Sequence, residues 1–253
     1  MTRVVKIGGR PQSDPSLPAA IATAWRAHAG SLVLVHGGGD EVSALQTAFG
    51  VTATFVGGRR VTSGRDLDIV RMALSGSANK RLVSALISEG VRAVGLSGED
   101  ASLIGARPVD AKRMGYVGAP STINVSLLST LLAANYLPIV SPVSRDELGE
   151  MGTTLNVNGD DAAAAIAAAL GAAELLLVAD VPGVMSDGAV IDRLSPELAR
   201  TLIANGTAVG GMAAKIDAAL SALSAGVPRV RISDIAAIVD QDRGTVLADI
   251  GEL

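Results

Sequence analysis

Short apolar runs alternate with longer segments of helical periodicity along most of the chain. Several of the apolar runs are bounded by glycine or proline, as is typical of strands buried in a parallel sheet. We predict strands at Arg3–Ile7, Ser31–Val35, Val91–Leu96, Leu137–Ser141, Glu174–Ala179 and Arg229–Ile232. We predict helices at Leu17–His28, Glu41–Phe49, Arg65–Glu89, Ser126–Ala134, Asp160–Leu170, Pro196–Ala204 and Met212–Ala225.

This alternation predicts an α/β protein with right-handed crossovers and helices on both faces of a mostly parallel sheet. The segment Gly98–Ile123 differs, because its glycine-spaced, strand-like pattern has no helical period. We interpret it as a hairpin that passes over one end of the sheet. Only a glycine turn at Gly171 joins a predicted helix to the next strand, which favours two lobes that share one continuous sheet. The predicted lobes are residues 1–170 and 171–253.

The composition narrows the function classes. The 253 residues are 49% hydrophobic and 18% charged, which excludes intrinsic disorder. A net charge of −4 and an aromatic content of 2% disfavour nucleic-acid binding. The absence of cysteine excludes disulfides and thiolate metal sites. The longest apolar stretch, residues 162–179, contains Glu174 and Gly171, so we interpret it as a buried helix and strand, not a membrane span. We therefore expect a cytoplasmic protein.

Two glycine turns follow predicted strands, in the sequences Lys6-Ile7-Gly8-Gly9 and His36-Gly37-Gly38-Gly39-Asp40. Backbone N–H groups at such turns can bind an anion, although glycine is also common wherever a strand leads into a helix. The chain lacks G-x-x-x-x-G-K-[ST], and no G-x-G-x-x-G follows the first strand, which disfavours a dinucleotide-dependent oxidoreductase. Lys6 and Lys215 each lie beside a glycine pair and could hold a polyanion from two sides, or be ordinary snorkelling or solvated lysines.

Polar residues also precede the alanine-rich helix. Asp160 or Gly159 is the expected N-cap of that helix. Capping leaves Asn156 and Asn158 unexplained, and their spacing places them on one side of a strand-like segment. We interpret these asparagines as ligand contacts.

Two further positions carry candidate binding groups. Asp180 follows the most apolar predicted strand, where adenosine or phosphates could dock. Arg59 and Arg60 are adjacent to glycine and could supply a fork for a carboxylate, or be two solvated surface charges.

The motifs form one ordered series: Lys6-x-Gly8-Gly9, His36-Gly37-Gly38-Gly39, Gly58-x-Arg60-Val61-Thr62, Ala73-Leu74-x-Gly76-x-x-Asn79-Lys80, Asn156-Val157-Asn158-x-Asp160, Asp180-Val181-x-Gly183-Val184 and Gly211-Met212-x-x-Lys215. In this order and spacing the chain resembles the amino acid kinase family over nearly its whole length. The resemblance implies an open, mostly parallel eight-stranded sheet sandwiched by helices in three αβα layers. It also implies that lobe 1–170 binds an acyl amino acid and mediates dimerisation, while lobe 171–253 binds ATP.

The resemblance implies a role for each matching residue. Lys6 and Lys215 would stabilise the transferring phosphoryl group, and Asp160 would organise them. Backbone N–H groups of Gly8, Gly9 and Gly38 would lie near the phosphates. The residues expected to hold the acyl amino acid are Gly38, Gly39, Asn156 and Arg60, the last through the α-carboxylate. The residues expected to bind the nucleotide are Gly8, Gly9, Asp180, Val181, Gly183, Val184, Gly211 and Met212.

Within the family, the motifs are most similar to members that use ATP to phosphorylate the γ-carboxylate of N-acetyl-L-glutamate in arginine biosynthesis. Such a carboxylate has a pKa of roughly 4.3, so it is ionised at pH 7 and needs no catalytic base. Mg²⁺ would be held mainly by the ATP phosphates, without a dedicated protein site. The alternatives are a kinase for N-succinylglutamate or carrier-bound aminoadipate, and a catalytically silent small-molecule sensor on the same scaffold.

The resemblance also leads to an expectation about assembly. Arginine-sensitive members of the family carry an extra N-terminal helix that links dimers into a hexameric ring. Here the first predicted strand begins at about Arg3, and the segment Asp240–Leu247 lacks the aromatic residue found in those members. We therefore expect a homodimer that arginine does not inhibit.

Overall fold

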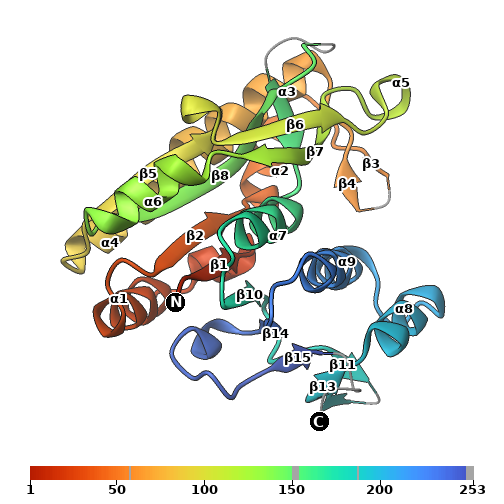
Figure 1. The fold of residues 1–253 in the computed structure, drawn as a ribbon. Helices are drawn as coiled ribbons and strands as arrows, with labels where there is room; N and C mark the ends of the chain where they lie inside the picture. Colours follow the sequence, from red (N-terminus) through yellow and green to blue (C-terminus); the bar gives the residue numbers. More distant parts are fainter. Residues whose placement is uncertain (57, 150–153, 187, 249–253) are drawn as a thin grey trace.

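Figure 1 shows the protein in a computed structural model, which describes residues 1–56, 58–149, 154–186 and 188–248. The strands are β1 (Arg3–Ile7), β2 (Leu32–His36), β3 (Phe55–Val56), β4 (Arg59–Arg60), β5 (Ala93–Gly98), β6 (Ile104–Pro108), β7 (Val117–Ile123), β8 (Leu137–Asp146), β9 (Thr154–Val157), β10 (Glu174–Val178), β11 (Met185–Ser186), β12 (Ala189–Val190), β13 (Arg193–Leu194), β14 (Val230–Ser233) and β15 (Thr245–Leu247). The α-helices are α1 (Leu17–Ala27), α2 (Gly39–Ala48), α3 (Gly64–Arg71), α4 (Asn79–Ser88), α5 (Ala111–Met114), α6 (Val125–Ala133), α7 (Gly159–Ala169), α8 (Pro196–Ala204) and α9 (Gly210–Ser224). Three short 3₁₀-helices are described, η1 (Arg10–Ser13), η3 (Asp100–Ser102) and η4 (Ile235–Ile238), and η2 (Met72–Ala78) is a π-helix.

One sheet of eleven strands runs through the described residues, in the order β13-β15-β14-β10-β1-β2-β8-β6-β7-β9, with β5 beside β8. Its centre is parallel, and β1 lies between β10 and β2 with Lys6 opposite Leu177 and Val35. Strands β2 and β10 are buried at every residue, as continuous apolar runs in a covered parallel sheet should be. The predicted α/β class and the six predicted strands are confirmed. The strand count exceeds eight because short strands extend both edges.

Strand β8 is long enough to serve two sets of neighbours. Its first half lies between β2 and β5, and its last residues pair with β6 and β9. Because β6 also pairs with β7, and β7 with β9, these four strands close into a cycle. The hairpin predicted within Gly98–Ile123 is therefore present as β6 and β7, but the prediction that it passes over the sheet is wrong. It extends the sheet instead, because β8 and β9 offer partners for its backbone groups.

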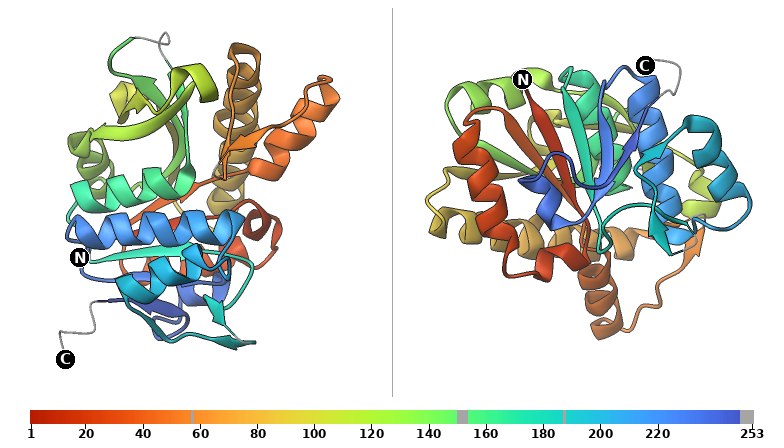
Figure 2. Two further views of the ribbon diagram at one scale, coloured as in Figure 1. Left: turned by 90° about the vertical axis from the view of Figure 1, so that its right-hand side faces the viewer. Right: turned by 90° about the horizontal axis from the view of Figure 1, so that it is seen from below.

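Helices cover both faces of the sheet (Figure 2). Helices α1 and α4 pack against each other on one face, and α7 and α9 lie side by side on the other. Alanine suits α7, because small side chains let this helix approach both β1 and α9 closely. None of the described helices combines the length and the apolar character that a membrane crossing requires.

The predicted helix over Arg65–Glu89 contains a π-helical segment. Helix α3, the π-helix η2 and α4 follow one another without a break. Ser63 begins the run with a capping box, in which its hydroxyl accepts from the Asp66 N–H and the Asp66 carboxylate accepts from the Ser63 N–H. π-helical turns are rare and often mark functional sites. Here the segment places Leu74 against the second glycine turn and brings Asn79 to His36.

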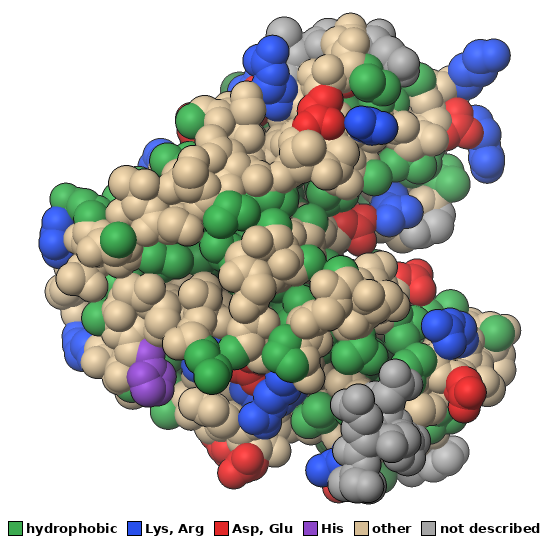
Figure 3. All heavy atoms as spheres, viewed as in Figure 1, with side chains coloured by type: hydrophobic (Ala, Val, Ile, Leu, Met, Phe, Trp, Pro, Cys, Tyr) green, Lys and Arg blue, Asp and Glu red, His purple; other side chains and the backbone are tan. Residues whose placement is uncertain are grey.

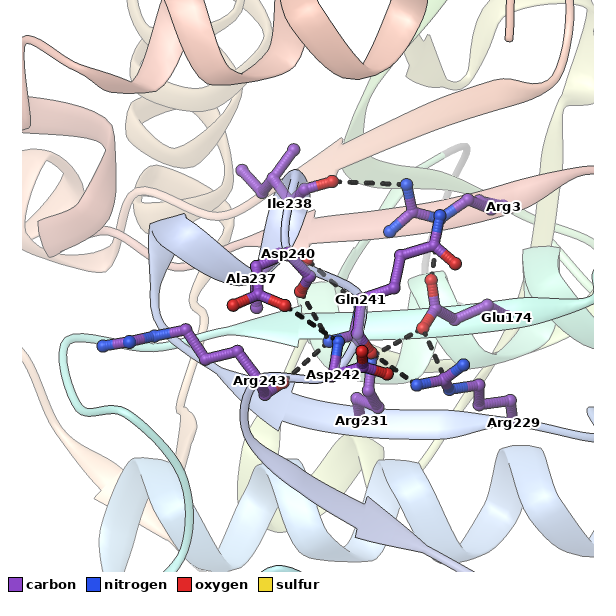
Figure 4. A network of polar contacts seen from close by, with 10 residues as sticks. All are labelled: Arg3, Glu174, Arg229, Arg231, Ala237, Ile238, Asp240, Gln241, Asp242 and Arg243. Atoms are coloured by element: carbon purple, nitrogen blue, oxygen red, sulfur yellow. Dashed lines mark hydrogen bonds and ion pairs between the residues drawn. The ribbon is translucent and has the colours of Figure 1, made fainter. Parts of the chain in front are cut away.

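A buried ionic network lies at the amino ends of β1, β10 and β14 (Figure 4). Arg231 is completely buried, and its Nε donates to Oε1 of Glu174 at 2.6 Å. Arg3 donates to the other oxygen of Glu174 at 2.7 Å. The remaining nitrogens of Arg231 donate to the backbone carbonyls of Ala237, Asp240 and Arg243. A buried guanidinium is tolerated only when it is paired in this way, so the network ties the loop after β14 to the sheet.

Candidate active site

The carboxyl ends of β1 and β2 place the two predicted glycine turns side by side. The strands pair in parallel with Ile7 opposite His36, so both chains leave the sheet at the same level. A Cβ atom on Gly9 would lie 3.6 Å from the nitrogen of Gly39. At Gly38, φ is +153° and a Cβ would lie 2.8 Å from Leu74 Cδ2. Position 38 therefore requires glycine, because of its backbone angle and the close approach of Leu74, whereas a Cβ at position 9 would make only an ordinary contact.

The N–H groups of the two turns differ in availability. Neither Gly9 nor Gly38 donates its N–H to an acceptor among the described residues. The N–H of Gly8, in contrast, donates to the carbonyl of Val178 on β10 at 3.3 Å. The Gly8 N–H therefore already has an acceptor on the neighbouring strand, and its role beside the phosphates stays a prediction. Gly9 and Gly38 keep the expected free donors.

Lys6 and Lys215 both contact Asp160. The distance from Lys6 Nζ to Asp160 Oδ1 is 2.9 Å, and that from Lys215 Nζ to Asp160 Oδ2 is 3.3 Å. The three residues are only 5%, 9% and 4% exposed, respectively. They come from β1, α9 and the first turn of α7, which are far apart in sequence. The structure thus brings together all three residues that the sequence singled out for catalysis.

Burial and charge act in opposite directions on this cluster. Burial lowers the pKa of Lys6 to about 8, and Lys215 adds to that shift, although attraction to Asp160 opposes it. For Asp160, burial alone would raise the pKa, but the two ammonium groups outweigh it and hold the pKa below its usual value. Asp160 therefore remains a carboxylate at neutral pH, and the cluster carries more positive than negative charge.

The start of α7 differs from the sequence prediction by one or two residues. Asn158, and not Asp160 or Gly159, is the N-cap, and its side-chain oxygen accepts from the N–H of Asp160 at 2.7 Å. Capping by Asn158 leaves the carboxylate of Asp160 free for the lysines. Glycine at position 159 leaves room for the Lys6 side chain, because a Cβ there would make a tight contact of 3.2 Å with Lys6 Cε. Asn158 was expected to be a ligand contact; it also lines the first of two cavities.

The first cavity, of about 200 Å³, lies between the second glycine turn, β4 and β9. It is lined by all four residues that the resemblance assigned to the acyl amino acid, namely Gly38, Gly39, Arg60 and Asn156. Lys6 and Asp160 also line it. The sequence did not identify its apolar wall, which consists of Val42, Phe55, Val70, Leu74, Val117, Pro142 and Val157. No periodicity distinguishes such residues from the rest of the core.

The adjacent arginines Arg59 and Arg60 have different surroundings. Arg60 donates to the carbonyl of Gly39 at 2.9 Å and to Ser43 Oγ at 2.8 Å, and it also contacts Gln46. These contacts hold its guanidinium against the cavity. Arg59 also lines the cavity, but it forms an ion pair with Asp161 at 2.7 Å. The interpretation of the two arginines as freely solvated surface charges is therefore wrong.

Asn156 faces the same cavity from β9. Its side-chain nitrogen donates to Thr62 Oγ1 at 2.9 Å, and that hydroxyl donates in turn to the carbonyl of Arg60. The Asn156 amide and the segment that carries Arg60 are thus fixed relative to each other.

The second cavity, of about 470 Å³, lies on the other side of the lysine cluster. It contains most of the residues that the sequence assigned to the nucleotide, namely Gly8, Gly9, Asp180, Val181, Gly211 and Met212, together with Lys215. Gly183 and Val184 do not line it. They pack against Thr245, whose hydroxyl accepts from the N–H of Val184 at 2.7 Å.

The sequence reasoning missed Arg10 at the mouth of the second cavity. This exposed side chain pairs with Asp180 at 2.8 Å, and the interaction lowers the pKa of that carboxyl group.

The space-filling view shows a deep notch on one side of the molecule, with acidic and basic side chains on both of its lips (Figure 3). Across the described ranges, no group of three or more His, Cys, Asp or Glu side chains is arranged to hold a metal ion.

Comparison with known proteins identifies a family. The profile of the amino acid kinase family matches residues 1–234. A protein named acetylglutamate kinase from Geobacillus thermodenitrificans is 43% identical over 233 residues, which cover 91% of this chain and 89% of that protein. A protein of the same name from Chloroflexus aurantiacus is 42% identical over 240 residues, which cover 94% of this chain and 93% of the other.

Solved structures have the same fold. The crystal structure of smu.665 from Streptococcus mutans UA159 is similar with a TM-score of 0.89 at 30% identity, and 98% of each chain is covered. N-acetylglutamate synthase from Neisseria gonorrhoeae, complexed with coenzyme A and N-acetyl-glutamate, gives a TM-score of 0.81 at 27% identity, over 98% of this chain and 59% of that one. The family profile spans nearly the whole chain and the identities exceed 40% over most of it, so this protein belongs to the amino acid kinase family.

Proposed function

We propose that this protein transfers the γ-phosphoryl group of ATP to the γ-carboxylate of N-acetyl-L-glutamate, a step of arginine biosynthesis. The products are N-acetylglutamyl 5-phosphate and ADP. The observation that carries the proposal is the position of the lysine cluster between two cavities. Lys6 lines the first cavity and Lys215 lines the second, and Asp160 contacts both lysines. The names of the relatives support the choice of acyl amino acid.

The chemistry requires positioning and charge, and no base. The attacking carboxylate is already ionised, so nothing has to remove a proton from it. Phosphoryl transfer spreads negative charge over the oxygens of the moving group. Lys6 and Lys215 would approach that group from opposite sides, while the free N–H groups of Gly9 and Gly38 add donors from the glycine turns.

Arg60 would hold the non-reacting α-carboxylate of the acyl amino acid. Its guanidinium is fixed by Gly39 and Ser43 at the wall of the first cavity. Asn156 would orient the rest of the backbone-like part of the substrate. The apolar wall around Val42 and Leu74 suits the hydrocarbon and acyl portions, which carry no charge.

The residues present fit a Mg²⁺ ion that ATP itself brings. The described side chains provide no cluster of three or more acidic or imidazole ligands, and Asp160 is engaged by both lysines. A magnesium ion that keeps water and phosphate oxygens as its ligands needs no such cluster. When bound, it would neutralise charge on the phosphates.

We further propose that residues 1–170 form the lobe for the acyl amino acid and for dimerisation, and residues 171–253 the lobe for ATP. Every residue that lines the first cavity lies within 6–160, and Asp180, Gly211 and Lys215 line the second, while Gly9 and Gly39 line both. We propose a homodimer, the commonest closed assembly, located in the cytoplasm. Light scattering of the purified protein tests the assembly.

The activity is tested by trapping the acyl phosphate with hydroxylamine as the hydroxamate. The substrates are N-acetylglutamate, N-succinylglutamate, aspartate and carbamate, each with ATP and Mg²⁺. We expect hydroxamate and ADP in equal amounts with N-acetylglutamate and little product with the others. A preference for N-succinylglutamate would correct the identity of the acyl group. If no ATP is consumed with any of the four substrates, the proposal is contradicted.

A further inference from the structure

One glutamine side chain, which the mechanism above does not use, connects the two glycine turns. Gln12 lies in η1, and its Nε2 donates to the carbonyl of Gly8 at 3.1 Å and to that of Gly37 at 2.8 Å. Both acceptors are carbonyl oxygens, so only the nitrogen of the amide can face them. The Oε1 atom is buried and has no donor among the described residues. Both N–H bonds of this amide are thus committed to the turns.

The two carbonyls determine where two N–H groups point. The Gly8 carbonyl shares a peptide with the Gly9 N–H, and the Gly37 carbonyl shares one with the Gly38 N–H. The described chain has no cis peptide bond, and in a trans peptide the C=O and N–H point in opposite directions. When Gln12 holds the carbonyls on its own side, the N–H groups of Gly9 and Gly38 are turned away from it. Both of these glycines line the first cavity.

A second support fixes the Gly37 carbonyl. His36 Nδ1 lies 2.8 Å from that oxygen, and His36 Nε2 lies 3.1 Å from the side-chain nitrogen of Asn79. Because an amide nitrogen can only donate, Nε2 is the acceptor and Nδ1 carries the proton that Gly37 receives. Burial lowers the pKa of His36 to about 4, so the ring is neutral at pH 7, as this arrangement requires.

The arrangement leaves an unfavourable feature in place. A buried acceptor without a donor, such as Gln12 Oε1, costs free energy and is rare in folded proteins. A side chain kept for packing alone would be better served by an apolar residue of the same size. The cost is understandable if the two donated hydrogen bonds matter for the site, where local rules are most often broken.

We propose that Gln12 is a positioning residue that aims the N–H groups of Gly9 and Gly38 at the phosphoryl group during transfer. It does not touch the substrate, and it acts through the two peptides that it holds. The inference rests on the proposed kinase activity for its catalytic consequence. The aim of the two N–H groups can be tested without that activity.

The kinetic test compares Gln12→Leu and Gln12→Glu with the parent protein. Both replacements are close in size to glutamine, and neither can donate to the two carbonyls. Loss of one preorganised donor commonly lowers kcat by about 10²–10³-fold, so misdirection of two donors that remain present should lower it by roughly tenfold or more. Arg60 and Asn156 are untouched, so KM for the acyl amino acid should change by less than about threefold. Ser13→Ala, an exposed neighbour on η1, serves as the matched control.

A binding test separates positioning from folding. ADP with Mg²⁺ and aluminium fluoride mimics the phosphoryl group in flight, whereas ADP with Mg²⁺ alone does not. We expect the Gln12 variants to bind the fluoride complex about tenfold more weakly than the parent, with ADP affinity and melting temperature close to those of Ser13→Ala. An equal fall in kcat, ADP affinity and melting temperature would show a merely structural role and overturn the proposal.

Nuclear magnetic resonance gives a readout that does not depend on turnover. The amide signals of Gly9 and Gly38 should shift when the parent protein is titrated with the ADP–aluminium fluoride complex, and the shifts should be much smaller in Gln12→Leu. If the parent lacks kinase activity yet inorganic phosphate produces the same Gln12-dependent shifts, the proposed function fails and the role of Gln12 stands. Shifts of the same size in parent and variant would overturn the role of Gln12, whatever the activity.

Discussion

The Oδ1 atom of Asp160 lies 2.9 Å from the Nζ atom of Lys6, although the two residues are far apart in the sequence. The contact exists because α7 begins beside the carboxyl end of β1, and because Gly159 lets the lysine stem pass at close range. Lys215 approaches the other oxygen from α9. One carboxylate thereby holds two lysine side chains close together in a buried site.

The first prediction concerns these two lysines. Lys6→Ala and Lys215→Ala should each lower kcat by about 10²–10³-fold, because each removes a preorganised charge beside the moving phosphoryl group. ATP affinity should fall much less. Initial rates and calorimetric ATP binding provide the two measurements. Lys112→Ala, at an exposed position, is the control. Either variant with kcat within threefold of the parent would remove that lysine from the mechanism.

The second prediction separates the two arginines. Arg60→Ala should raise KM for the acyl amino acid by roughly 10–100-fold with a smaller effect on kcat, because it removes charge-assisted hydrogen bonds to a carboxylate that does not react. Arg59→Ala should change KM less, because its charge is already paired with Asp161. Steady-state kinetics with varied amino acid decide between them. If Arg59→Ala raised KM strongly and Arg60→Ala left it unchanged, Arg59 and not Arg60 would be the residue that binds the carboxylate.

The third prediction concerns pH. The ammonium of Lys6 has a pKa of about 8, so the free enzyme loses this charge as the pH rises through that value. We expect kcat/KM to fall on the alkaline side with an apparent pKa near 8, since kcat/KM reports the free enzyme. Bound phosphates favour the charged form, so the corresponding fall in kcat should occur at higher pH. The measurement is a pair of pH–rate profiles. In Lys6→Arg, whose side chain does not titrate in this range, any residual activity should lack that alkaline limb.

The fourth prediction concerns the network at the opposite end of the strands. Glu174→Ala should lower the free energy of unfolding by about 3–5 kcal/mol, because it leaves the completely buried Arg231 without a counter-charge. Urea denaturation measures this change. Burial alone would raise the pKa of Glu174, but Arg231 and Arg3 outweigh it and hold the pKa below its usual value. The stabilising contribution of Glu174 is therefore present at neutral pH and is lost as the pH falls through the folded-state pKa. The exposed Glu197→Gln is the control, and equal stability of both variants would contradict the role given to Glu174.

The central strands could be predicted from sequence because burial on both faces leaves a plain signature, an unbroken apolar run such as β10. The strands β11, β12, β13 and β15 leave none, because two or three residues are too few to show an alternating pattern. The pairing of β13 with β15 also joins segments that are distant in sequence. Hydrophobic periodicity also cannot show whether a hairpin such as β6 and β7 extends the sheet or covers it. Both arrangements need the same residue types.

Site residues could be predicted where their residue type is unusual for their position and neither packing nor capping explains it. A lysine at the end of a buried strand, beside a glycine turn, is such a case, and Lys6 lies where expected. The N-cap of α7 was assigned to Asp160 or Gly159 instead of Asn158, because asparagine, glycine and aspartate are all good caps and only the backbone angles decide among neighbours. Gln12 and Arg10 lie past the first glycine turn, where nothing in the local pattern shows which groups they reach.

The π-helical segment between α3 and α4 has a consequence for how this chain can change length. A π turn is what remains when one extra residue is accommodated inside an α-helix. Deleting one residue of η2, such as Gly76, would restore a regular helix but rotate one end against the other by about 100°, the angle of a single helical residue. After such a deletion, the helix could keep either the capping box of Ser63 or the contact between Asn79 and His36, but not both. The spacing between these two anchors therefore leaves little freedom for single-residue insertions and deletions, even though the outer face of the helix is exposed.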